Sequence, residues 1–136
     1  MSYKVNKVEL VAVSNLPAPQ RYDYSIRKVG DWGEVWSVRD DNGWRLYADD
    51  LGTQLVPVWP AEAFAEACCT GDWQGCYPKS IPLADWLDRW VPGMMKDGRK
   101  VAVFPLPSDR GVLVEPDRTA SDIRSVMEDL IDPAEF

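Results

Sequence analysis

The feature that most constrains this chain is an Asn-Gly pair between two short runs of β-prone residues. Asn42-Gly43 separates residues 34–39 from residues 44–48, and both runs are rich in β-branched or aromatic side chains. A two-residue hairpin turn needs positive φ at both turn positions, which Asn and Gly accept at low cost. The pattern therefore predicts a β-hairpin in which Asp41 pairs with Trp44 and Trp36 lies opposite Asp49.

A third strand is predicted over residues 54–59, after a turn at residues 49–52. Together with the hairpin it would form a three-stranded antiparallel meander. Pro57 has no N–H to donate to a neighbouring strand. We therefore expect this strand to lie at a sheet edge or to end at Pro57.

Two helices are predicted before the meander. Asn6 can cap a short helix that ends near Asn15, with Glu9 at the third helical position. A second helix should begin at Pro19 and stop at Gly30, because Pro fits the first turn and Gly commonly follows the last. The apolar side chains on its buried face are Tyr22, Ile26 and Val29.

Two more helices are predicted in the middle of the chain. One begins at Pro60 and ends at Gly71, and residues 72–80 then form a loop. The other covers residues 83–90, where Pro92-Gly93 should terminate it. Their apolar stripes are Ala61, Phe64, Ala65, Cys68 and Cys69 in the first, and Leu83, Trp86, Leu87 and Trp90 in the second.

The C-terminal third of the chain predicts two strands and a final helix. Residues 101–104 form a continuous apolar run typical of a central strand, and a turn at 108–111 leads into a strand at 112–114. Thr119 and Asp122 have the spacing of a capping box. The stripe of the last helix is Ile123, Val126, Met127, Leu130 and Ile131, and Pro133 ends it.

Strands and helices mixed at hairpin-length spacing are typical of an α+β protein. We expect one domain over residues 1–136, with an antiparallel sheet of about five strands and helices packed against it as a single pair of layers. The length suits one domain, and no repeat or flexible linker divides the chain.

The chain has no histidine, and this excludes several kinds of site. Ser-His-Asp or Cys-His catalysis and His-ligated metals all need imidazole. Three cysteines are too few for a structural zinc site. Cys68 and Cys69 fit an apolar stripe, whereas Cys76 is the one candidate for an exposed thiol. We expect no metal, no cofactor and a protein that is not an enzyme, although acid–base chemistry by carboxylates stays open.

Charge and targeting signals narrow the partners and the compartment. The net charge of −7 argues against nucleic acid, which attracts a basic face. Neither a signal peptide nor a membrane-spanning segment is predicted, and an odd number of cysteines, two of them adjacent, favours a reducing compartment. We expect a cytoplasmic protein, monomeric or homodimeric, that binds a protein partner and does not associate with a membrane.

Seven tryptophans are the most informative part of the composition. Tryptophan has a large apolar ring and one N–H, so it serves interfaces as well as cores. Trp86 and Trp90 are expected in the core, whereas Trp59 and Trp73 are expected to form a partly exposed aromatic patch. The candidate ligand- or partner-binding residues are Trp59, Trp73, Trp36, Trp44, Arg45 and Asp49.

Five motifs occur in an order that resembles a small bacterial family catalogued as domain of unknown function 2750. They are Arg21-Tyr22, VWSVRDDNGW at residues 35–44, VPVWP at 56–60, IPL at 81–83 and AVFP at 102–105. The resemblance extends from Leu16 to the last helix. It implies no known activity. Members often have His after the Trp-Pro pair, where this chain has Ala61. Either this protein lacks a chemistry that the His serves in other members, or the position is not catalytic, and the resemblance favours the second reading.

These observations favour a non-catalytic binding or protein-interaction module. An acidic surface with aromatic patches suits a basic protein partner. The alternative is a small-molecule-binding protein or an enzyme whose pocket combines carboxylates and tryptophan.

Overall fold

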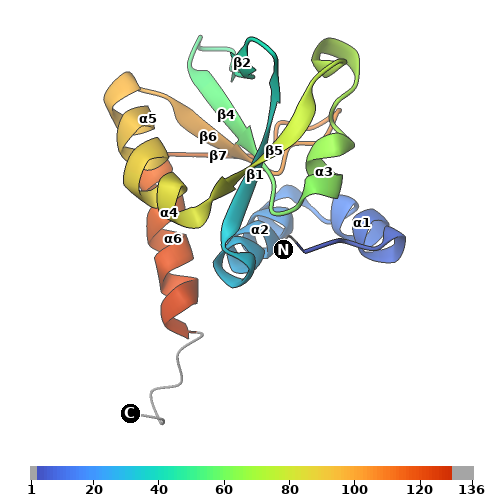
Figure 1. The fold of residues 1–136 in the computed structure, drawn as a ribbon, viewed down its shortest axis with the longest axis horizontal. Coiled ribbons are helices and arrows are strands. Elements are labelled where there is room, and N and C mark those ends of the chain that lie inside the picture. Colours follow the sequence, from blue (N-terminus) through green and yellow to red (C-terminus); the bar gives the residue numbers. More distant parts are fainter. Residues whose placement is uncertain (1–2, 130–136) are drawn as a thin grey trace.

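The computed structural model describes residues 3–129 and shows helices around two small β-sheets (Figure 1). The first sheet has the strand order β2-β1-β5, and the second has the order β3-β4-β6-β7. The α+β class expected from the sequence is confirmed, with the expected strands distributed over two sheets. In the described residues the strands are β1 (Glu34–Asp40), β2 (Gly43–Trp44), β3 (Tyr47–Ala48), β4 (Gln54–Val58), β5 (Tyr77–Pro82), β6 (Lys100–Val103) and β7 (Val112–Val114).

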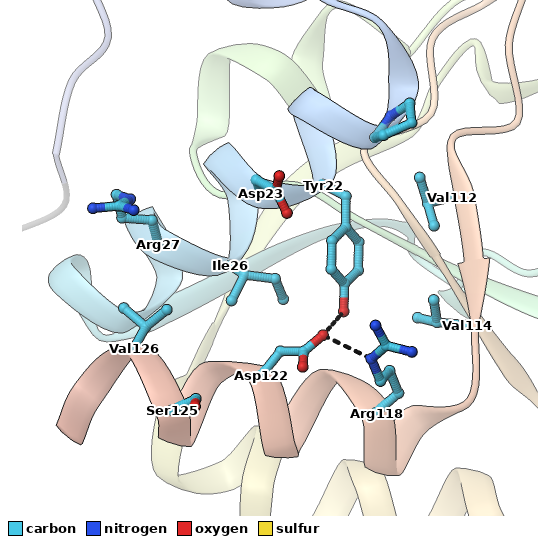
Figure 2. A pocket seen from close by; sticks show the side chains of 11 residues that line it. Tyr22, Asp23, Ile26, Arg27, Val112, Val114, Arg118, Asp122, Ser125 and Val126 are labelled. Atoms are coloured by element: carbon cyan, nitrogen blue, oxygen red, sulfur yellow. Dashed lines mark hydrogen bonds and ion pairs between the residues drawn. The ribbon is translucent and has the colours of Figure 1, made fainter. Parts of the chain in front are cut away.

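The two longest helices, α2 and α6, pack against each other and against the second sheet (Figure 2). The short helix α1 is capped as expected, because the Asn6 side chain accepts the N–H of Glu9 at 2.8 Å. The helices are α1 (Lys7–Ser14), α2 (Ala18–Trp32), α3 (Glu62–Glu66), α4 (Leu83–Asp85), α5 (Val91–Asp97) and α6 (Pro116–Asp129), with a 3₁₀ turn η1 (Gly71–Trp73) and a π-helical segment η2 (Trp86–Trp90).

The hairpin is present, but its register differs from the expected one. Asp40 lies opposite Gly43 and Arg39 opposite Trp44, so Asp41 and Asn42 form the turn. The expected pairing of Asp41 with Trp44 is therefore wrong. The Asp40 carboxylate accepts the N–H of Asn42 at 2.8 Å. This side-chain bond favours a turn that begins one residue earlier.

The predicted three-stranded meander is divided between the two sheets. After Trp44 the chain leaves β1, and β3 pairs with β4 in the second sheet. Trp36 lies opposite Trp59 rather than Asp49, and their backbone N–H and carbonyl groups form reciprocal bonds of 2.9 and 2.8 Å. This short bridge joins the two sheets.

The other neighbour of β1 is β5, in a segment that was expected to be a loop. Pro78 and Pro82 lie in β5, which is an edge strand, and an edge strand tolerates residues that cannot donate to a ladder. Pro57 differs, because β4 lies between β3 and β6 and runs parallel to β6. The expected edge position is wrong, but β3 pairs only as far as Leu55. Beyond it the Pro57 carbonyl accepts the Ser37 hydroxyl at 2.6 Å.

Two helix ends differ from the predictions. The second helix continues past Gly30 and ends at Gly33, which has a φ of 73°. Pro92 does not terminate a helix, because α4, η2 and α5 are continuous and the π-helical turn precedes the proline. A π turn changes the hydrogen-bond spacing and so accommodates a residue without an N–H. The helical segment ends at Gly98.

The helices α3 and α6 also differ in extent. Helix α3 ends at Glu66, well before Gly71. Helix α6 begins at Pro116, so Thr119 lies inside it and is not its cap. The Thr119 hydroxyl donates to the Pro116 carbonyl at 2.7 Å and accepts the Trp86 indole N–H at 3.2 Å. The predicted stripe residues Leu130 and Ile131, and Pro133, lie outside the described residues.

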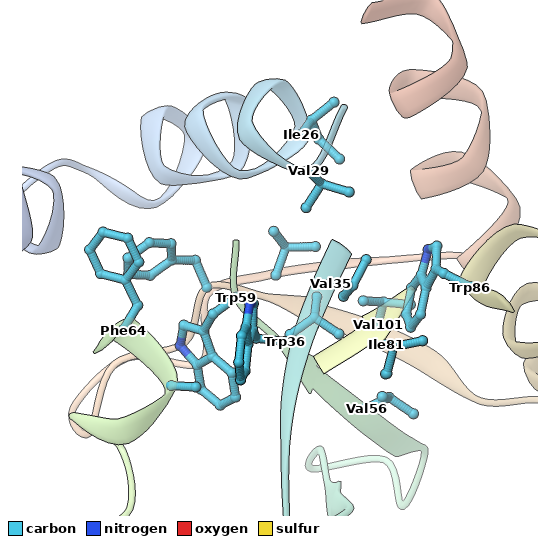
Figure 3. Close-up of a cluster of buried hydrophobic side chains, with 14 of the residues drawn as sticks. Ile26, Val29, Val35, Trp36, Val56, Trp59, Phe64, Ile81, Trp86 and Val101 are labelled. Carbon is cyan, nitrogen blue, oxygen red and sulfur yellow. The ribbon is translucent and has the colours of Figure 1, made fainter. Parts of the chain in front are cut away.

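The core fills the space between the sheets and the helices (Figure 3). Trp59, Trp86, Phe64 and Phe104 are each at most 2% exposed. Tyr22, Ile26 and Val29 are buried on α2, as expected, and residues 101–104 are buried in and just after a central strand. The buried indole N–H groups of Trp59 and Trp86 have internal partners, the Pro105 carbonyl and the Thr119 hydroxyl.

Candidate functional site

A pocket of about 740 Å³ lies where three segments meet at one end of the second sheet. Its walls are residues 47–48 of β3, residues 70–73 around η1, and residues 105–110 between β6 and β7. We call it the loop pocket. Its volume falls in the range of natural ligand sites.

The wall formed by residues 105–110 lies between two residues with positive φ, Phe104 and Gly111. Among the described residues, Phe104 is the one non-glycine residue with positive φ, and its φ is 54°. Gly111 has a φ of 76°, and a Cβ atom there would lie 2.3 Å from the Val103 carbonyl oxygen. For a non-glycine residue such as Phe104, this conformation persists only where the surrounding structure holds it, and such residues concentrate at functional sites.

Arg21 holds this loop from inside the protein. Its residue is 2% exposed, and its guanidinium donates to the carbonyls of Phe104 at 3.2 Å and Leu16 at 2.7 Å. The same group donates to Asp109 Oδ2 at 2.9 Å. The other Asp109 oxygen accepts the N–H of Gly111 at 2.8 Å. This backbone bond, together with Arg21, lowers the pKa of Asp109 below its usual value.

Three further side chains fix the same loop. The Pro105 carbonyl accepts the Trp59 indole N–H at 2.9 Å and the Cys68 thiol at 3.3 Å. The Tyr47 hydroxyl donates to the Arg110 carbonyl at 3.2 Å. Burial raises the pKa of the Cys68 thiol to about 12, so it stays protonated and donates. The loop is thus held by the hydrogen bonds of four separate parts of the chain.

Aromatic rings form another part of the pocket wall. Trp73 is half-buried and contacts the Tyr47 ring at 5.4 Å between centroids, with 68° between the ring planes. Behind it, Trp59 meets Trp73 edge to face at 6.1 Å. Edge-to-face packing fixes ring orientation, so the Trp73 ring has a defined position in the pocket.

The structure places the predicted tryptophans in different roles. Trp73 lines the loop pocket and is half-buried. Trp59 is 1% exposed and its N–H is already bonded, so the expected exposed patch at Trp59 is wrong. Trp36 is also buried, beside Trp59. Trp44 lies elsewhere and packs against Trp90, 4.9 Å between centroids.

The two predicted polar residues, Arg45 and Asp49, also lie in different places. Arg45 lies near the pocket, because its guanidinium donates to the Asp72 carbonyl at 3.3 Å and pairs with Asp40 at 3.5 Å. Asp49 is a turn residue, whose carboxylate accepts the N–H groups of Leu51 and Thr53, each at 2.9 Å. The structure therefore gathers Trp59, Trp73 and Arg45 around the loop pocket, but not Trp44 and Asp49.

Sequence reasoning missed Arg21 and Asp109. A signal for Arg21 exists, since it lies four residues before Ser25 and eight before Val29, on the buried face of α2. A charged residue on such a face needs buried partners, and this requirement marks it as unusual. No comparable pattern identifies Asp109, because its partner lies 88 positions away.

A second pocket of about 600 Å³ lies between α2, α6 and β7 (Figure 2). We call it the helix groove. The Tyr22 hydroxyl donates to Asp122, which also accepts Arg118 Nε at 3.0 Å. Burial, and then Asp122, raise the pKa of Tyr22 above its usual value, so the phenol stays protonated and cannot act as a base.

Neither pocket contains an activated nucleophile. In the loop pocket the Cys68 thiol and the Tyr47 hydroxyl both donate to carbonyls, and no imidazole exists to activate them. Within residues 3–129, no three Cys, Asp or Glu side chains gather closely enough to hold a metal ion. The loop pocket is a partly aromatic cavity, and hydrogen bonds from distant side chains hold one of its walls.

Comparison with known proteins identifies one family. The model of a family described as "Protein of unknown function (DUF2750)" matches residues 22–123, which is 102 of the 136 residues. No curated protein and no solved structure matches the chain. Over the described part of the chain, no helix is both long and apolar enough to cross a membrane.

Proposed function

Since the chain belongs to the DUF2750 family of proteins of unknown function, we propose a function from its site: a non-catalytic module that binds a protein partner through the loop pocket. The observation that carries this proposal is the loop at residues 104–111, whose backbone carbonyls accept hydrogen bonds from several side chains in distant parts of the chain. A surface that is already rigid loses little conformational freedom on binding, which favours affinity and specificity.

The distribution of hydrogen bonds supports binding rather than catalysis. Arg21, Trp59 and Tyr47 each direct a side-chain donor at a loop carbonyl. These groups stabilise the protein backbone and are not free to transfer protons. The exposed side chains of Thr70 and Ser108, together with the half-buried Trp73, remain available to a partner.

The proposal includes a bacterial, cytoplasmic protein that is a single domain and a monomer or homodimer. Its reduced cysteines support the cytoplasm, since Cys68 packs as a small apolar residue and donates a hydrogen bond. Its net charge of −7 supports a protein partner rather than nucleic acid.

Site-specific photo-crosslinking in the source cells tests this function. A photoreactive residue at Ser108 and another at Thr70 lie on different segments of the wall of the loop pocket, and both positions are exposed. We expect both to capture the same protein, identified by mass spectrometry, and expect Trp73→Ala to abolish this capture.

The matched control is a photoreactive residue at Lys96, which is exposed on α5, away from the loop pocket. Capture of the same protein from Lys96, or no capture from Ser108 and Thr70, contradicts the proposed function. Circular dichroism of each purified variant confirms that the fold is retained.

A second candidate function is small-molecule binding in the same pocket. The combination of Trp73 with the carboxylates of Asp72 and Asp109 favours it. The volume suits a small ligand. A thermal-shift screen of metabolites tests it, and only a ligand whose stabilisation disappears in Trp73→Ala supports it.

A further inference from the structure

Around the loop pocket, each of three arginines forms an ion pair with one aspartate, while the carboxylate of Asp72 has no such partner among the described residues. Arg21 pairs with Asp109 at 2.9 Å, Arg110 with Asp50 at 2.8 Å, and Arg45 with Asp40 at 3.5 Å. Asp72 lines the pocket and is exposed, and within residues 3–129 no cationic side chain lies within 4.0 Å of its carboxylate. The pocket therefore has an uncommitted negative charge and no uncommitted positive charge.

The aromatic wall beside Asp72 is also free of cations. Elsewhere in the described chain, arginine or lysine groups stand over the rings of Phe104, Tyr24, Trp32 and Trp44. No such contact involves Trp73 or Tyr47 in residues 3–129. Trp73 directly follows Asp72, so a carboxylate and a tryptophan ring occupy adjacent positions at the pocket wall.

A cation is the chemistry that suits both groups. The face of a tryptophan ring attracts ammonium and guanidinium groups, and a neighbouring carboxylate adds a charge-assisted hydrogen bond. The net charge of −7 raises the local concentration of cationic ligands around the protein. A guanidinium also has a flat surface that stacks on aromatic rings, which an ammonium lacks.

We infer that the loop pocket binds a cationic group, the side chain of an arginine or lysine on a basic protein partner, against Trp73 with Asp72 as its counter-ion. This inference rests on the proposed binding function of the same pocket. Arg110, the one cation of the described pocket wall, stays paired with Asp50.

The test is an NMR titration of the purified full chain with capped tripeptides. The probes are Ac-Gly-X-Gly-NH₂ with arginine, lysine, citrulline or glutamate at X. Citrulline has the shape of arginine without its charge. The readout is the set of tryptophan indole N–H signals, with the Trp73 signal assigned from the Trp73→Phe variant.

We expect the arginine and lysine peptides to shift the Trp73 signal, and the citrulline peptide to bind at least about fivefold more weakly. Asp72→Asn should weaken arginine binding about threefold to fivefold. The matched control Asp88→Asn removes the same charge from an exposed position in η2 and should leave binding unchanged. Trp73→Leu keeps apolar volume but loses the ring, and should weaken binding about fivefold.

Agmatine, a small guanidinium without a peptide backbone, separates the two sources of such a cation. Tighter binding of the arginine tripeptide supports a protein side chain, whereas tighter binding of agmatine supports a small amine ligand. Equal binding of arginine and citrulline peptides, or equal loss in Asp72→Asn and Asp88→Asn, overturns the inference. A partner captured by crosslinking at Ser108 and Thr70 would still support the proposed function in that case.

Discussion

The loop pocket and the helix groove have similar volumes but are built in different ways. Hydrogen bonds to backbone carbonyls hold the wall of the loop pocket, and they come from Arg21, Trp59, Cys68 and Tyr47. In the helix groove the hydrogen bond between α2 and α6 joins two side chains, Tyr22 and Asp122 (Figure 2). Packing between side chains of α2 and α6 also holds this groove together.

This difference indicates which pocket tolerates change. A backbone wall fixed by long-range bonds has one shape, and a substitution that alters it affects the whole pocket. Helices in contact through flexible side chains can adjust by small shifts. The loop pocket therefore has the more strictly defined shape of the two.

The largest effect is expected from Gly111→Ala. Its Cβ would lie 2.3 Å from the Val103 carbonyl oxygen, in a conformation with positive φ, so the loop must move. We expect a loss of more than about 3 kcal/mol in the free energy of unfolding, measured by urea denaturation. Gly52→Ala is the control, since Gly52 has a φ of 83° and open space around its Cβ position. It should cost only about 1–2 kcal/mol. Equal losses would show that the loop is not rigid.

Arg21→Met should have the next largest effect. It keeps an apolar chain of similar length but removes the donors to Phe104, Leu16 and Asp109. Buried carbonyls without partners cost free energy, so we expect a loss of about 3 kcal/mol. Hydrogen–deuterium exchange should show increased exchange at residues 104–111. Unchanged exchange there would contradict the role of Arg21 in holding the loop.

The pH dependence of stability tests the Arg21–Asp109 pair separately. The pKa of Asp109 is lowered in the folded protein, so the carboxylate stabilises the fold above its unfolded pKa of about 4. This contribution disappears as the pH falls through the lower folded value. The stability gap between wild type and Asp109→Asn should therefore be present at about pH 7 and shrink below about pH 4. A gap that does not vary with pH would exclude this contribution.

Tyr22→Phe should weaken the helix groove by a smaller amount. It removes the phenol bond to Asp122, which keeps its bond to Arg118, so we expect about 1 kcal/mol. Tyr77→Phe is the matched control, because Tyr77 is 43% exposed. It should change stability by less than about 0.5 kcal/mol. If Tyr22→Phe lowered the free energy of unfolding more than Arg21→Met does, the helix groove would depend on its hydrogen bonds more strongly than the loop pocket, contrary to the comparison above.

The smallest effect is expected from Gly30→Ala in the helix groove. A Cβ there would lie 3.0 Å from Cγ1 of Val126, a side-chain atom that can shift. Alanine also has the higher helix propensity, which offsets the crowding. We expect stability within about 0.5 kcal/mol of wild type. A loss as large as that of Gly111→Ala would show that the groove is as rigid as the loop pocket.

Local signals predicted the elements that depend on local chemistry. The Asn6 cap predicts α1, the run at residues 101–104 predicts a central strand, and the Asn-Gly pair predicts a hairpin. Each of these rests on residues close in sequence, and each is present in the structure. The α+β class follows from the same elements.

What sequence reasoning missed depends on contacts between distant residues. The sequence of β5 is typical of a loop because it contains two prolines. It forms a strand because it pairs with β1. Trp36 pairs with Trp59 instead of continuing the meander, and Trp59 donates to Pro105, so its burial follows from the fold. Of the candidate site, the sequence indicated Trp73 and Arg45, while the wall formed by residues 105–110 became visible only in three dimensions.

The order of the strands along the chain has a consequence for dividing this protein. Strands β1 and β4 precede the segment between α3 and β5, while their partners β5 and β6 follow it. A single cut in that segment breaks both sheets at once. It leaves the pairs β1–β2, β3–β4 and β6–β7 and an unpaired β5, none of which is large enough to fold alone. The two fragments would regain structure only by associating. This segment is therefore a suitable site for splitting the protein into two fragments whose association can be detected by the recovery of the fold.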